Sequence, residues 1–313
     1  MFIISRLNLL SLIIFSYGFI ISFFFIPLHF GGDAVHYTAA YNAVANESNI
    51  LKSRVGYLNS LYSYEIGQFL IYFYYSSLGL DKILLDSLSN GVLYLLGFRL
   101  AYNYGNSFSL AFLLILTNYY IFTFLFTLEK LKFSIIFLFL GLLIIRNGRD
   151  KLGSVFLFIS ALSHFQIVIY YISHSFEYIF KKNIHNKKCY LLLLIIISLI
   201  SFLILSDYII SKLDWYIKLA SEDSLYNFSK IFVFGSFVYI LSGMKKEVAF
   251  FYVCLSSIAL VIGSDRVMMF AYFYFISVAF NARKYGMLAL YTSIAYMSYR
   301  SCKYIVMVVQ TGG

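Results

Sequence analysis

An acid, a histidine and two phenols stand close together in the stretch GGDAVHYTAAY, at residues 31–41. Asp33, Tyr37 and Tyr41 recur every four residues, so they share one stripe of a helix, and His36 borders that stripe. A carboxylate beside phenolic hydroxyls is suited to binding a glycan. Two other interpretations stay open: Asp33 as the N-cap of this helix, and the tyrosines as part of an interfacial aromatic belt.

Two further side chains could transfer a proton. Glu65, in LYSYEIGQFL, stands at the start of an apolar run, where a carboxylate can still reach water and act as a general base. His164, in ISALSHFQIVIY, lies inside an apolar run, where a histidine usually faces the protein interior. The candidate acid–base residues are therefore Asp33, Glu65 and His164. The alternatives are a structural ion pair for Glu65 and an interhelical hydrogen bond for His164.

Arginines at the ends of apolar runs form a third group: Arg99, Arg146, Arg149 and Arg266. A planar guanidinium binds phosphate in a bidentate manner, whereas topology selection needs only positive charge and does not favour arginine. We therefore expect these four to bind a diphosphate, with Arg149 also acting in catalysis. The alternatives are a miscounted span, which would move Arg146 and Arg149 to the cytoplasmic side, and local pairing of Arg149 with Asp150. Trp215, the single tryptophan, either stacks on a sugar or anchors the chain at the interface.

Several common catalytic patterns are missing from the sequence. It has no glycine-rich loop of nucleotide-binding spacing, no His/Cys metal cluster, no Ser–His–Asp pattern and no Asp-x-Asp pair for a metal–nucleotide sugar. Cys189, Cys254 and Cys302 stand far apart and indicate no disulfide framework. We therefore expect no metal and no other cofactor, and soluble sugar nucleotides are not the expected donors.

The elements that must position these residues are membrane helices. Hydrophobic residues make up 61% of the 313-residue chain and charged residues only 12%, whereas a soluble domain has about 25% charged residues. The formal net charge of +10 lies in short loops, so membrane orientation and anionic lipid explain it better than nucleic acid. The composition predicts an all-α, polytopic integral membrane protein.

The apolar runs predict about eleven spans of roughly 20 residues each, within a single transmembrane domain over 1–313. The predicted spans are 7–28, 62–80, 84–102, 107–128, 131–146, 152–176, 189–207, 228–243, 247–264, 267–282 and 286–306. Two longer connections, 29–61 and 207–227, contribute to the predicted site. The first run is too long for a cleaved signal and is interpreted as a retained helix.

Lysines in the short loops predict the orientation. The strongest cluster is Lys181, Lys182, Lys187 and Lys188. If the spans alternate, Lys82, Lys130 and Lys132 fall on the same side, which should be cytoplasmic. The N-terminus is then cytoplasmic, and both long connections and the four arginines lie outside.

The order of these motifs resembles the EpsG-like branch of the bacterial polysaccharide repeat-unit polymerases, the Wzy class. The motifs are GGDAVHYTAAY, YEIG, FRLA, RNGRDKLGSVFLFISALSHF and DRVMMFAYFYF, which together cover roughly residues 30–275. One departure is Ile66, where the family usually has proline.

The resemblance implies a metal-independent membrane glycosyltransferase of the lipid-linked (GT-C-like) type. Such enzymes join oligosaccharide repeats carried on undecaprenyl diphosphate at the periplasmic face of the bacterial inner membrane. The implied partners are lipid-linked donor and acceptor glycans, membrane lipid and a chain-length regulator protein, without nucleic acid. The products would be surface polysaccharides such as O-antigen or exopolysaccharide. The alternatives are a flippase or transporter of lipid-linked sugars, and another glycosyltransferase or ligase that uses a lipid-linked donor.

Overall fold

The computed structural model describes residues 6–62, 65–105, 107–164, 167, 171, 223–243, 245–262 and 264–312. Every regular element in these ranges is a helix, as the composition predicts. Contacts divide the chain into two compact units, which are described separately: a first unit of Met1–Ile167 with Thr292–Gly313, and a second unit of Val168–Tyr291. The predicted span 189–207 and most of the connection 207–227, with Trp215, lie outside the described residues.

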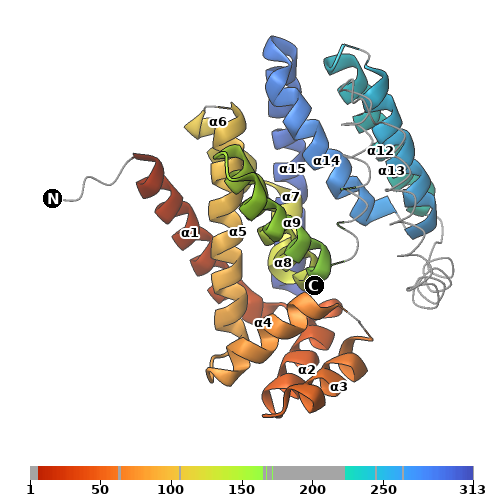
Figure 1. The fold of residues 1–313 in the computed structure, drawn as a ribbon. Coiled ribbons are helices and arrows are strands. Elements are labelled where there is room, and N and C mark those ends of the chain that lie inside the picture. The colour runs from red at the N-terminus through yellow and green to blue at the C-terminus, as the bar shows by residue number, and fades with distance from the viewer. Residues whose placement is uncertain are drawn as a thin grey trace. The chain divides into compact units, whose positions relative to one another are not determined.

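The first unit is built on two long helices, α1 (Arg6–Phe25) and α5 (Lys82–Gly105). They pack side by side and run in opposite directions (Figure 1). Two hydrogen bonds fix this direction: Asn90 Nδ2 donates to Ser22 Oγ (3.0 Å), and Arg99 Nη2 donates to Asn8 Oδ1 (2.7 Å). The start of α1 therefore lies beside the end of α5.

Three short helices, α2 (Asp33–Ala45), α3 (Ile50–Leu61) and α4 (Ile66–Ser77), follow α1 and a 3₁₀ turn at Ile26–Leu28. They gather at the end of the first unit where α5 begins (Figure 1). Each has 12 or 13 residues, or about 20 Å of helix, which is shorter than the roughly 30 Å hydrocarbon core of a bilayer. The predicted span 62–80 is therefore wrong, because α4 is too short to cross.

The chain then forms α6 (Phe108–Leu116) and α7 (Tyr119–Phe126), which meet at an angle of 47°. The predicted span 107–128 is broken at this point, where the Asn118 side chain accepts a hydrogen bond from the Tyr120 backbone N–H (2.9 Å) and caps α7. The break leaves polar backbone groups between two apolar segments.

Helices α8 (Glu129–Arg146) and α9 (Asp150–Ser163) form a close antiparallel pair. Glycines allow the two backbones to approach: a Cβ added to Gly153 would lie 2.8 Å from the carbonyl oxygen of Gly141. Further along the pair, Ser134 and Ser160 each donate to the other's carbonyl oxygen at 2.7 Å. This packing places the end of α9 beside the start of α8.

Two helices of the described residues are long and apolar enough to cross a membrane: α1 with its 3₁₀ extension, and α5. A third is gained if α6 and α7 together count as one broken span. The described residues thus account for two or three of the roughly eleven predicted spans, alongside shorter apolar helices.

The predicted alternation of the spans is wrong. It puts Arg99 and Asn8 on opposite faces, yet they are hydrogen bonded. It also puts Lys130 and Glu65 on opposite faces, yet they form an ion pair (3.4 Å). The reason is that α4 does not cross, so the helices from α5 to α9 run opposite to the predicted direction.

The second unit contains α12 (Asp223–Leu241), α13 (Lys246–Ile262) and α14 (Ser264–Asn281), which pack on one another. Aromatic rings fill the interfaces between them: Phe251 stacks on Tyr274 with ring centroids 4.0 Å apart. Helix α15 (Arg283–Thr311) begins in this unit, and its residues from Thr292 onward belong to the first unit. There Ser301 Oγ donates to the Thr117 carbonyl, at the break between α6 and α7 (2.9 Å).

Candidate functional site

Two of the predicted acid–base residues lie in contact. Glu65 directly precedes α4, and His164 directly follows α9 in extended conformation. The imidazole Nδ1 of His164 donates a hydrogen bond to the Glu65 carboxylate at Oε1. Both side chains are about one tenth exposed, 11% and 10%. An imidazole that a carboxylate holds in a fixed orientation can act as a general base for a hydroxyl proton.

Two cations flank this pair. The Nζ atom of Lys130, in the first turn of α8, lies 3.4 Å from Oε2 of Glu65. Arg54 of α3 donates from Nη1 to the main-chain carbonyl of Glu65 (3.1 Å), and its guanidinium carbon lies 5.2 Å from the centre of the Tyr57 ring. Four helices therefore converge on Glu65, and they bring one carboxylate, one imidazole and two cations together.

A glycine allows the approach that joins the pair. Gly67 of α4 lies against Ser163, the last residue of α9, so closely that an added Cβ would be 2.6 Å from the α-carbon of Ser163. Since real Cβ atoms essentially never come within 3.0 Å of another heavy atom, only glycine fits this crossing. Glu65 and His164 are each at most two residues from it, so the packing of the two helices sets their separation.

A chain of buried hydrogen bonds leads from α3 through α4 to α8. Tyr57 donates to Gln68 Oε1 (2.9 Å), and Gln68 Nε2 donates to the Tyr72 hydroxyl (2.8 Å). Tyr72 in turn donates to the carboxylate of Glu129, the residue before Lys130. This chain holds the short helix α4 against the start of α8, beside the Glu65–His164 pair.

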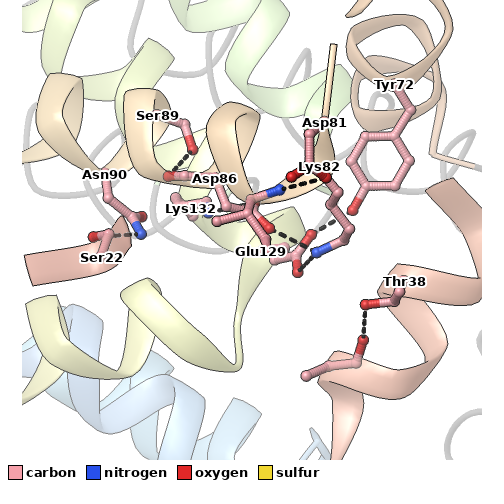
Figure 2. Close-up of polar contacts among 12 residues, drawn as sticks. Ser22, Thr38, Tyr72, Asp81, Lys82, Asp86, Ser89, Asn90, Glu129 and Lys132 are labelled. Carbon is pink, nitrogen blue, oxygen red and sulfur yellow. Dashed lines mark hydrogen bonds and ion pairs between the residues drawn. The ribbon is translucent and has the colours of Figure 1, made fainter. Parts of the chain in front are cut away.

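This run of hydrogen bonds leads at Glu129 into a buried cluster of four charged side chains (Figure 2). Lys82 Nζ lies 2.6 Å from both Asp86 Oδ2 and Glu129 Oε1, and Lys132 Nζ lies 3.0 Å from Asp86 Oδ1. The four residues are 9% exposed or less. Two carboxylates face two ammonium groups, so each buried charge has an oppositely charged partner and the cluster is neutral.

Sequence reasoning missed this cluster because it interpreted Lys82 and Lys132 as cytoplasmic charges that set the orientation of the spans. A signal was present: Lys82 and Asp86 are spaced i,i+4, and Glu129 and Lys132 are spaced i,i+3, each pair at the start of an apolar helix. Ionisable residues at such positions usually face the protein interior and pair with one another.

The residues of α2 that were predicted to bind glycan differ in their burial. Tyr37 and Tyr41 of α2 are only 6% and 4% exposed, and the Tyr41 hydroxyl donates to the carbonyl of Leu80 (2.6 Å). Burial raises the pKa of Tyr41 to about 12. Asp33, the first residue of α2, is exposed, as is His36. The helix forms as predicted, with the phenols packed inside and the acid facing outward.

The predicted diphosphate-binding arginines lie apart from the Glu65–His164 pair. Arg99 is near the end of α5, where it contacts the start of α1. Arg146 ends α8 and donates to the main-chain carbonyl of Asn103. Arg149 is exposed before α9, whose far end carries His164, about 20 Å of helix away. The structure thus gathers Arg99 and Arg146 at one end of the first unit and the acid–base pair at the other.

Two residues of the predicted site are not among the described residues of the first unit. Arg266 is in the first turn of α14, in the second unit, and its side chain is not among those described. Trp215 lies outside the described residues.

Among the described residues, no three His, Cys, Asp or Glu side chains form a group that could hold a metal ion. No family model, curated protein or solved structure matches this chain.

Proposed function

We propose that this chain is an inner-membrane glycosyltransferase that polymerises oligosaccharide repeat units carried on undecaprenyl diphosphate. The observation that supports it most is the Glu65–His164 pair, held between Lys130 and Arg54 at one end of two helices long enough to cross a membrane. The pair supplies a base for an acceptor hydroxyl, and the cations supply positive charge for a phosphate leaving group. The order of sequence motifs points to the same reaction.

In the proposed reaction, the His164 imidazole takes the proton from an acceptor sugar hydroxyl. The hydroxyl oxygen bonds to the anomeric carbon of the donor glycan, and the bond from that carbon to the diphosphate oxygen breaks. Negative charge then grows on the departing lipid diphosphate. Lys130 and Arg54 lie where they can meet this charge, which stabilises the transition state more than the ground state. Glu65 holds the imidazole in position for this proton transfer.

Arg99, Arg146 and Arg149 have no part in this step, because they are at the other end of α5, α8 and α9. The periplasmic face is proposed to be the end that carries α2, α3 and α4. Exposed Asp33, at the start of α2, is proposed to contact glycan beyond the reacting sugar.

Elongation of lipid-linked repeat units by the purified full chain in detergent tests this proposal. The wild type should give a ladder of longer products, and Glu65→Gln and His164→Asn should each slow elongation about 100-fold or more, the usual contribution of general acid–base catalysis. Glu47→Gln, which alters an exposed carboxylate near the end of α2, is the matched control and should elongate normally. Wild-type ladders from both site variants would rule out the proposed role of the pair.

One observation favours a second function, transport of the same lipid-linked sugars. The break of 47° between α6 and α7 resembles the discontinuous helices that form substrate sites in transporters. Two measurements separate the two functions: the length of the products in detergent, and movement of the lipid-linked repeats across vesicles. A transporter reconstituted in vesicles would move lipid-linked repeats between leaflets and leave their length unchanged, whereas a polymerase lengthens them in detergent.

A further inference from the structure

We propose that the end of the first unit where α1 begins binds the phosphate groups of anionic phospholipids, and that it therefore faces the cytoplasmic leaflet. This "basic end" consists of Arg6, Arg99, Arg146, Arg149 and Lys151. The inference goes beyond the proposed reaction: it requires that α1 and α5 cross a membrane, and it does not depend on any chemistry at Glu65.

Helix packing brings the basic end together from distant parts of the sequence. Arg99 of α5 donates from Nε to Ser11 Oγ (3.0 Å) and from Nη2 to Asn8 Oδ1 (2.7 Å), which ties it to the first turns of α1. Arg146 of α8 donates to the carbonyl of Asn103, near the end of α5. The start of α1 and the ends of α5 and α8 therefore lie together, and their arginines gather at the same end of the first unit.

Aromatic rings lie at the same level as these cations. The guanidinium carbon of Arg146 is 4.7 Å from the centre of the Tyr104 ring, and that of Arg6 is 5.0 Å from the centre of the Phe108 ring. An amphipathic ring such as that of Tyr104 is typical of the boundary between hydrocarbon and headgroups. Because α1 and α5 are the two helices apolar enough to cross a membrane among the described residues, this end of both helices falls at that boundary.

The two ends of the first unit differ in unpaired charge. At the basic end, Arg6, Arg146, Arg149 and Lys151 are exposed, and Asp150 is the one acid that its described residues supply. At the opposite end, Lys82, Lys130 and Lys132 each form an ion pair with a carboxylate. Exposed Lys52 is outnumbered there by the exposed acids Asp33, Glu47 and Asp81. Exposed positive charge is therefore concentrated at the basic end. It matches the anionic phospholipids of the cytoplasmic leaflet, and a planar guanidinium is suited to their phosphates.

Cysteine labelling tests the orientation. In full-length chain with Cys189, Cys254 and Cys302 replaced by serine, exposed Asn147 of the basic end and exposed Glu47 of the opposite end are each changed to cysteine. A membrane-impermeant maleimide should label Glu47→Cys in intact cells, and Asn147→Cys only after the membrane is permeabilised. Labelling of Asn147→Cys in intact cells would overturn the proposal. Both cysteine variants keep every arginine of the basic end.

Lipid dependence tests the ligand. The full chain is reconstituted in phosphatidylcholine alone and in phosphatidylcholine mixed with phosphatidylglycerol, and its thermal unfolding midpoint is measured. Phosphatidylglycerol should raise the wild-type midpoint by about 2–4 °C, and added salt should reduce this gain. A variant with Arg146→Gln, Arg149→Gln and Lys151→Gln should lose most of the gain, while Lys52→Gln, at the opposite end, should keep it. An equal gain in the triple variant and the wild type would refute phosphate binding by these residues, whatever the outcome of the elongation experiment.

Discussion

Replacing Gly67 with alanine should separate the proposed acid–base pair without removing either member. The added Cβ would overlap with the side-chain Oγ of Ser163 and would lie 2.6 Å from its α-carbon. A side-chain rotation can relieve the overlap with Oγ, but the α-carbon belongs to the backbone and can move only with its helix. Reaching 3.4 Å, where ordinary van der Waals contact begins, from 2.6 Å moves α4 and α9 apart by about 0.8 Å.

This shift acts directly on the pair, because Glu65 is two residues before Gly67 and His164 is one residue after Ser163. A misplacement of about 1 Å can cost roughly 100-fold in rate, and overpacking where two helices cross costs about 1–3 kcal/mol in stability. Gly67→Ala should therefore elongate lipid-linked repeats about 100-fold more slowly and unfold at a somewhat lower temperature. Adding Ser163→Ala should not restore elongation, because the backbone of residue 163 remains in place.

Gly97→Ala is the matched control for this prediction. Gly97 is also inside a buried helix, but the nearest atom to its added Cβ is the terminal Cδ1 of Ile115 at 2.9 Å, which can rotate away. Elongation by Gly97→Ala should stay near the wild-type rate. If Gly67→Ala keeps both its unfolding temperature and its elongation rate, the close crossing of α4 and α9 does not set the geometry of the site, and the reasoning fails.

Three further predictions concern stability. Lys132→Met should lower the free energy of unfolding by about 3 kcal/mol, because it leaves buried Asp86 with one cation fewer, whereas exposed Lys52→Met should change it little; chemical denaturation in detergent measures both. Burial raises the pKa of Tyr41 to about 12, so between pH 10 and 12 the unfolded phenol ionises while the folded one does not. Stability should fall over that range, and less steeply in Tyr41→Phe. Burial lowers the pKa of His29, so below about pH 6.5 the unfolded state takes up a proton that the folded state resists; acid should lower the unfolding midpoint, and less so in His29→Gln.

The sequence predicted the all-helical class and singled out two side chains that the structure brings into contact, Glu65 and His164. Both predictions rest on local properties: apolar runs favour helices, and polar residues at the edge of such runs or within them are unusual. The sequence did not predict which apolar runs are long, straight crossings. The run at 62–80 has suitable composition, but its helix ends at Ser77 after 12 residues, and the run at 107–128 bends by 47° at Asn118.

The predicted direction of a helix depends on every crossing counted before it, so one wrong crossing at 62–80 reverses the helices from α5 to α9. This is why Arg99 was expected on the face of Glu65 and instead contacts the start of α1. Burial was equally hard to predict, because a lysine in a connecting loop and a lysine in a neutral buried cluster look alike in sequence. Only the spacings of Lys82 with Asp86 and of Glu129 with Lys132 indicated the second environment.

The separation of the two ends constrains any chemistry that this chain performs. From Asp86 to Arg99 is about 20 Å along α5, whereas a diphosphate and the sugar it leaves must be held within hydrogen-bond reach of one another. A reaction at Glu65 and His164 must therefore draw its positive charge from nearby residues, and Arg54 and Lys130 are the described cations that contact Glu65. Lys130→Gln should accordingly slow elongation, while Lys151→Gln at the basic end should leave it near the wild-type rate; the reverse result in the purified system would place the leaving group at the basic end.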